Sequence, residues 1–336
     1  MPDMRAEQRD PHRLIDLRLK TRKLLSEMKT AGIRDTKQAR QRFHRNIERL
    51  SGLAALPVYL IGTSMVLGHL GCVAAMKATK NKSSRPGDLT PGQTALARKY
   101  FNQLQAKSKS YFGLDARKIR GYHDPRRIFN LMLTKLPKEL DSGFQLVICS
   151  IVVGAWTAFE SLAEDLWVAA LNARPRLALM AMDAEIKDAT TGSDDEKKRR
   201  ITFPLPVWKI TQKGFNLGKQ MGDLLRNWQW DFSQRGAALK AYRKTFPKFK
   251  TDLDAIFLSK DLKWLIAARN VIVHNGGLID QQFADEAKEH PQFRIARVGQ
   301  PIPIDAGIAY GFTMTVVKSG LSLLDLVDSW LKNNPR

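Results

Sequence analysis

The sequence predicts an all-α protein, because apolar residues recur at helical spacing along most of its 336 residues and strand signals are few. The clearest pattern covers residues 144–172, where no proline interrupts a run rich in Val, Ile, Ala and Leu. Its first half is almost wholly apolar, which is typical of a helix buried on all sides. Pro175 marks its end. A second pattern, over residues 252–275, stops at Gly276-Gly277, a pair suited to a left-handed helix end.

Residues 1–50 predict one or two charged helices, in which a loose stripe of leucines separates Arg and Lys residues. The next segment, residues 53–76, contains no Asp, Glu, Lys or Arg and is long enough to span a bilayer. Pro57 and three glycines interrupt it, and basic clusters lie at both ends. We therefore favour a buried core helix, or two short helices broken near Gly62, over a membrane segment, which stays the open alternative.

The basic, small-residue stretch at residues 77–87 ends in Pro-Gly and is typical of a linker. We predict a basic helical N-terminal region over residues 1–85 and a helical domain over residues 90–336. In residues 92–140, basic side chains alternate with tyrosines and phenylalanines, among them Tyr100, Phe101, Tyr111, Phe112 and Tyr122. Such a mixture can hold single-stranded nucleic acid through phosphate contacts and stacking. We assign the aromatic residues to the core and keep the charges as candidates for binding.

The second half of the chain predicts further helices over residues 217–226, 236–246, 252–275 and 308–331. The third of these is either one helix or two joined near Ser259. Residues 293–304 are expected to be irregular or a hairpin. Residues 188–200 read as an exposed loop that ends in four consecutive cations, which are candidates for substrate binding. These are Lys197, Lys198, Arg199 and Arg200.

The charge of the chain indicates a polyanionic partner. Lys and Arg number 55 against 33 Asp and Glu, a formal net charge of +22. This excess attracts nucleic acid or an anionic membrane surface, although a basic surface without such a ligand is the plain alternative. Cys72 and Cys149 lie in apolar runs and predict buried free thiols in a reducing compartment, so we expect a cytoplasmic protein. The first thirty residues do not resemble a secretory signal peptide.

Several familiar catalytic patterns are missing from the sequence. The Gly214–Lys219 stretch is too short for a phosphate-binding loop, and Gln220 stands where that loop needs Ser or Thr. The histidines are scattered rather than paired at metal-ligand spacing. The acidic run at residues 194–196 reads as a solvated charge run. We therefore expect a protein without a resident metal or cofactor.

The strongest candidate site is the segment Arg269-Asn270-Val271-Ile272-Val273-His274, near the end of a predicted helix. Asn270 and His274 are four residues apart and share a helix face, with Arg269 to its side. Imidazole titrates near neutral pH and can move protons, while a guanidinium can stabilise charge on a phosphorane. The helix dipole favours a protonated His274, which suits a general acid or a charge stabiliser. The alternative is that Arg269 pairs with Asp254 or another acid and that His274 caps its own helix.

This segment resembles the R-x4-6-H motif of the HEPN ribonucleases, including the polar residue that often follows the arginine. The continuation Asn275–Asp280 is similar to that of many bacterial members, and Ala155–Glu160 is similar to their neighbouring helix, with an acid after an aromatic residue. The resemblance covers roughly residues 140–335. It implies an up-and-down helical bundle and a homodimer, in which two motif helices build one composite cleft.

The resemblance also implies an activity. It suggests metal-independent cleavage of RNA by Arg269, Asn270 and His274, with Glu160 as a second residue that orients Arg269 or, equally, as a surface acid. Family members of this type act as toxins beside an antitoxin or in phage defence, and some have lost cleavage and serve as binding or dimerisation modules. RNA, a second copy of the chain and an antitoxin or defence protein are the expected partners. Tethering to a membrane through residues 53–76 is not favoured.

Overall fold

The computed structural model describes residues 33–81, 84–112, 138–178, 180–181, 217–226, 230–288, 293–294 and 296–335, with a few residues between Leu17 and Ser26. In these residues the regular structure is helical, and one isolated antiparallel bridge joins Leu278 to Pro301. The all-α prediction is therefore confirmed.

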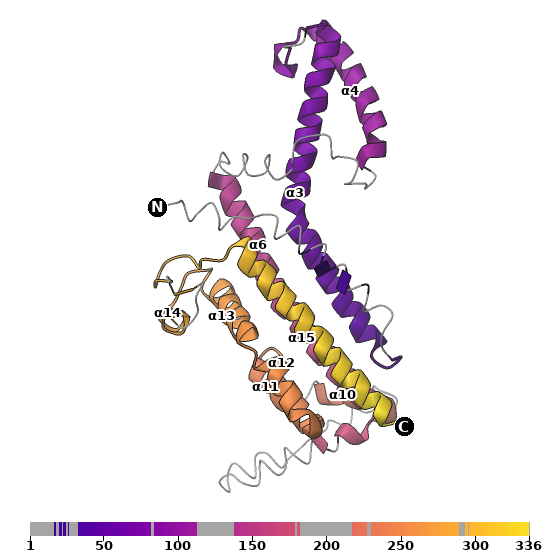
Figure 1. Cartoon of the computed structure of the whole chain (residues 1–336), viewed down its shortest axis with the longest axis vertical. Coiled ribbons are helices and arrows are strands. Elements are labelled where there is room, and N and C mark those ends of the chain that lie inside the picture. The colour runs from indigo at the N-terminus through magenta and orange to yellow at the C-terminus, as the bar shows by residue number, and fades with distance from the viewer. Residues whose placement is uncertain are drawn as a thin grey trace. The chain divides into compact units, whose positions relative to one another are not determined.

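The helices of the described residues are drawn in Figure 1. They are α3 (Lys37–Thr79), α4 (Pro91–Phe112), α6 (Lys138–Ala173), α10 (Leu217–Arg226), α11 (Arg235–Thr245), α12 (Lys250–Phe257), α13 (Lys260–His274), α14 (Gln281–Ala287) and α15 (Ala306–Asn333), with 3-10 turns at Pro86–Asp88 and Pro247–Phe249. The expected break at Ser259 is present, because its side chain caps the start of α13. The short helix α14, capped by Asp280, is not among the predicted elements.

The chain divides into two compact units. Unit 1 combines residues 1–54 with residues 145–336, and unit 2 is residues 55–144. The boundary predicted near residues 85–90 thus falls inside unit 2, between α3 and α4. The reason lies in α3, which continues through Pro57 and Gly62 without the expected break and so contributes to both units.

The apolar segment 53–76 lies within α3, but the side chains of residues 57–69 are outside the described residues. Among the residues that are described, one helical stretch is long and apolar enough to cross a membrane, Ser142–Ala173 in α6. Half of its most apolar window is buried inside the protein, as is usual for a core helix. The helix expected at residues 144–172 is thus present, but its first half is not buried on all sides as predicted, since Leu146 is 69% exposed and Gln145 and Ser150 are also exposed.

Helix α6 is the centre of unit 1. In Figure 1, α15 lies along α6, the first part of α3 runs on one side of these two helices, and α11, α12 and α13 lie on the other side, where α12 and α13 contact α15. Trp167 donates its indole N–H to Thr245 on α11 over 2.8 Å, and the Tyr242 hydroxyl donates to the backbone carbonyl of Ala163 over 2.7 Å. The rings of Phe159 and Phe257 meet edge-on. The buried indole of Trp167 and the buried hydroxyl of Tyr242 therefore have partners, and the aromatic residues fill the space between helices.

A glycine allows the closest approach between three of these helices. A Cβ atom added to Gly320 on α15 would lie 2.5 Å from the Phe43 ring of α3 and 2.9 Å from Leu162 of α6. Both neighbouring side chains are almost fully buried. Since heavy atoms do not approach so closely, the three helices can meet here only because position 320 has no side chain.

A buried ion pair fixes the start of α3 on the end of α15. Arg40 donates to one carboxylate oxygen of Asp328, and Thr36 donates to the other over 2.5 Å. Both charged side chains are less than 10% exposed. Because each oxygen has a donor, the pair avoids the large cost of an uncompensated buried charge.

We expect Gly320→Ala to destabilise unit 1 by about 1–3 kcal/mol, the usual range for overpacking a filled core. Gly311→Ala is the matched control, since it lies on the same helix with open space around its Cβ position. That change should stabilise the protein by about 0.5–1 kcal/mol through helix propensity. Urea unfolding of both variants measures the difference. Equal changes in the free energy of unfolding for the two variants would show that the packing around residue 320 has room for a side chain.

Candidate functional site

Helix α13 has one buried side and one outward side. Leu262, Leu265, Ala268 and Val271 point into unit 1, and Trp264 is also buried. The helix ends after His274, where the N–H groups of Asn275 and Gly277 both donate to the carbonyl of Val271. Gly276 and Gly277 have φ values of 60° and 83°. The left-handed end that the sequence predicts is therefore confirmed, and it stops the helix with His274 in its last turn.

The three motif side chains contact one another. Arg269 Nη1 donates to Asn270 Oδ1 over 3.1 Å and lies 3.2 Å from His274 Nε2. Asn270 and His274 are exposed, whereas Arg269 is half-buried. Its Nε atom is buried and has no hydrogen-bond partner in the part of the chain that the structure describes. The guanidinium is therefore held at its base by the protein and presents its outer edge to an exposed surface.

The contact between Arg269 and His274 joins a guanidinium to an imidazole. A guanidinium has donors and no acceptors, so in a hydrogen bond between these two groups Nε2 of His274 is the acceptor. An anion bound by Arg269 would compete with His274 Nε2 for the guanidinium donors.

The two alternative roles considered for these residues are not what the structure shows. Asp254 forms its ion pair with Arg243, at 2.5 Å from Arg243 Nη2, rather than with Arg269. The hydrogen-bond partner of the His274 ring is Arg269 and not a carbonyl at the helix end. Arg243 lies in the last turn of α11, which packs against α12.

Glu160 lies on α6, half-buried and within electrostatic reach of Arg269. Burial raises the pKa of the Glu160 carboxyl, and the charge of Arg269 opposes that rise. Glu164 and Asp231 raise the pKa further, and a hydrogen bond from Trp156 lowers it. The structure gives no hydrogen bond between Glu160 and Arg269 among the residues it describes. Glu160 therefore acts on Arg269 through its charge and not by direct contact.

The outward side of α13 is a feature that motif reasoning missed. Ile266, Ala267, Asn270, Val273 and His274 follow helical spacing on this side, and none of them is buried. Val273 is 45% exposed. Lys263 lies on the same side, three and four residues before Ile266 and Ala267, and its partly exposed side chain pairs with Glu286. Beyond Lys263, the outward positions 266, 267, 270 and 273 carry no charged side chain. The signal in the sequence was the spacing of the apolar residues at 266, 267 and 273.

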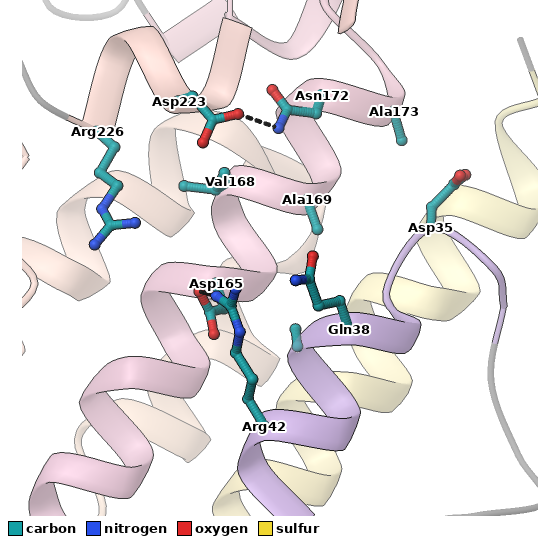
Figure 2. Close-up of a pocket in the computed structure, with 11 residues that line it drawn as sticks. Asp35, Gln38, Arg42, Asp165, Val168, Ala169, Asn172, Ala173, Asp223 and Arg226 are labelled. Carbon is teal, nitrogen blue, oxygen red and sulfur yellow. Dashed lines mark hydrogen bonds and ion pairs between the residues drawn. The ribbon is translucent and has the colours of Figure 1, made fainter. Parts of the chain in front are cut away.

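The four cations Lys197, Lys198, Arg199 and Arg200 lie outside the described residues, so the structure does not place them beside the motif. A separate pocket of about 380 Å³ opens between the start of α3, the last turns of α6 and α10 (Figure 2). Its polar side chains largely pair with each other: Arg42 contacts Asp165 at 2.9 Å, and Asn172 donates to Asp223 over 2.8 Å. No residue of α13 lines it.

Comparison of the chain with protein-family models, with curated proteins and with solved structures gives no match. The chemistry of the site therefore has to be inferred from its own side chains. In the described residues, no group of three or more His, Cys, Asp or Glu is arranged to hold a metal ion.

Glu160 predicts a specific dependence of stability on pH. Because its pKa is raised in the folded protein, its contribution to stability is present at low pH and is lost as pH rises through the raised value. Glu160→Gln mimics the protonated form, so its stability relative to wild type should increase over that interval. Asp285 is the opposite control, since hydrogen bonds from Lys288 and Gln281 lower its pKa.

Asp285→Asn should therefore lose stability relative to wild type as pH rises from the acid range. Unfolding midpoints measured across the carboxylate range test both changes. A parallel pH response of the two variants would contradict the burial of Glu160.

Proposed function

We propose that this protein is a metal-independent endoribonuclease, in which two copies of the chain build one composite site from their α13 helices. The observation that carries the proposal is the contact of Arg269 with both Asn270 and His274 at an exposed helix end. It supplies a fixed cation, a polar orienting group and a titratable group within one small surface. The net charge of +22 supports a polyanionic substrate.

The arrangement is suited to cleavage by the 2′-hydroxyl of RNA. This hydroxyl attacks the adjacent phosphorus, the bond to the 5′-oxygen breaks, and the products carry a 2′,3′-cyclic phosphate and a 5′-hydroxyl. The reaction moves one proton from the 2′-oxygen and one to the 5′-oxygen. A neutral His274 can accept the first, and a protonated His274 can donate the second. Arg269 stabilises the charge that develops on the phosphorane oxygens.

One motif supplies one imidazole, whereas the reaction benefits from a base and an acid together. A second copy of the chain would supply the other. The outward face of α13 supports this assembly, because Ile266, Ala267 and Val273 are exposed or half-exposed there and Ala267 permits close approach of another helix. Leu278, directly after the helix end, is 50% exposed and extends the apolar surface.

The resemblance to the HEPN ribonucleases supports a role in a toxin–antitoxin pair or in phage defence, with an antitoxin or defence protein as a further partner. The second candidate function is an RNA-binding or dimerisation module without catalysis. The apolar outward face of α13 supports this second function as strongly as the first, because the face bears on the assembly of two copies and not on cleavage. Cleavage itself separates the two.

Purified protein should cut single-stranded RNA in the presence of EDTA and leave cyclic-phosphate ends. His274→Ala should lower the cleavage rate by about 10²–10⁴-fold, the usual contribution of general acid–base catalysis. Arg269→Lys should also lower the rate, because it keeps the charge and loses the guanidinium fork. Arg297→Lys, at an exposed position, is the matched control and should leave the rate unchanged. Full activity of His274→Ala would rule out the proposed chemistry.

Ala267→Glu should separate the two copies, because it places a charge in the centre of the outward face of α13. Ala255→Glu makes the same change at an exposed position of α12 and is the control. Sedimentation should show a monomer only for Ala267→Glu, and RNA cleavage should be lost in the same variant. A monomeric variant with full activity would show that one chain carries a complete site.

A further inference from the structure

The described part of unit 2 contains a helical hairpin, formed by the second half of α3, the turn at residues 80–90 and α4. The turn is held by a hydrogen bond of 2.8 Å from the Thr79 hydroxyl to the Ser84 hydroxyl. Pro86 packs back against α3 near Gly71, where an added Cβ would make ordinary contact with its ring. These two contacts join the described residues on either side of the turn.

The charge of this hairpin is strongly one-sided. Residues 70–112 contain eight Lys and Arg and a single acid, Asp88, whereas the whole chain has 55 against 33. Five of these cations are described with their side chains, and all five are exposed. They are Lys77, Lys80, Arg85, Arg98 and Lys99.

No ion pair is given for these five cations among the described residues. In unit 1, by comparison, some surface cations pair with acids, as in Arg42–Asp165, Arg226–Glu164, Arg243–Asp254 and Lys263–Glu286. In the described part of the hairpin the structure gives no ion pair, and the Asp88 carboxylate accepts a backbone N–H. Unpaired like charges repel each other, so this surface is complementary to a polyanion that neutralises it.

Helix α4 divides into two faces. Ala97, Tyr100, Phe101 and Leu104 follow helical spacing and are buried or half-buried. Arg98, Lys99, Asn102 and Gln103 are exposed. Two cations beside two amides are groups that contact phosphate and sugar in nucleic-acid complexes. A membrane-bound helix would instead need its apolar face free to insert, and here that face is already covered in part.

We propose that the α3–α4 hairpin is a binding surface for the sugar-phosphate backbone of RNA, separate from the Arg269–His274 motif. It recognises charge and not sequence, because the five described Lys and Arg side chains of the hairpin are all exposed and such groups contact the phosphates of any sequence. The identification of RNA as the polyanion rests on the proposed function. The hairpin raises affinity for the substrate, while the motif performs the cleavage.

The test uses the full chain with His274→Ala as background, so that binding is measured without cleavage. The probe is a fluorescein-labelled single-stranded oligouridylate, followed by anisotropy over a series of salt concentrations. In the hairpin variant, Lys77, Lys80, Arg98 and Lys99 are all changed to Gln. The control variant carries the same loss of charge at exposed positions of unit 1, with Lys248, Lys250, Lys318 and Lys332 changed to Gln.

The hairpin variant should bind at least tenfold more weakly at low salt. The slope of log affinity against log salt should flatten by about 3, since each lost contact to single-stranded phosphate contributes about 0.7. The control variant should keep the wild-type slope. A further variant exchanges Lys for Arg and Arg for Lys at the same four positions. It should bind RNA as the His274→Ala background does, which would show that the hairpin variant is weakened by loss of charge contacts and not by loss of its fold.

Equal weakening in the hairpin and control variants would overturn the proposal, because it would show a general effect of net charge. Unchanged RNA binding in the hairpin variant would also overturn it. A parallel titration uses phosphatidylserine–phosphatidylcholine vesicles; loss of vesicle binding with RNA binding retained would assign the surface to a membrane instead. RNA that is bound but not cut by the unsubstituted protein would contradict the proposed ribonuclease activity and leave the hairpin surface standing.

Discussion

The close approach of α3, α6 and α15 at Gly320 is the constraint on which unit 1 depends. Because position 320 has no side chain, Phe43 and Leu162 fill the space above it, and the three helices share one contact. The buried Arg40–Asp328 pair then fixes the same helices further along α15. With α6 held from this side, α11, α12 and α13 can close over its remaining surface, and α13 is buried along one side only. The exposed side, with Asn270 and His274, is a consequence of that arrangement.

Ion pairs occur in one of the two units. In unit 1 several surface cations pair with acids, as in Arg42–Asp165, Arg226–Glu164 and Arg243–Asp254. The five described cations of the α3–α4 hairpin are exposed and have no ion pair among the described residues. Arg269 is half-buried near Glu160 and lies beside the exposed Asn270 and His274. The proposed binding surface and the proposed cleavage site therefore belong to different parts of the chain.

The local features of the site were predictable from neighbouring residues. Gly276-Gly277 predicted where α13 ends, and the spacing of four placed Asn270 and His274 on one face. The direct contact of Arg269 with His274 could not be predicted in this way. A spacing of five residues places Arg269 to the side of that face, and its long side chain has to bend toward His274 to reach it. The sequence also did not predict that Asp254 pairs with Arg243, because that pairing depends on how α11 packs beside α12.

By itself, the sequence determined the helical class, the bounds of α10, the C-terminal ends of α6 and α13, and the Arg269-to-His274 segment as the best candidate site. These properties depend on local spacing, on helix-ending glycines and proline, and on side-chain chemistry, all of which act over a few residues. Only the tertiary structure decided that the chain divides at residues 54/55 and 144/145, that α3 belongs to both units, and that Phe43 reaches Gly320. Those outcomes depend on contacts between residues more than a hundred positions apart, whose geometry no local pattern records.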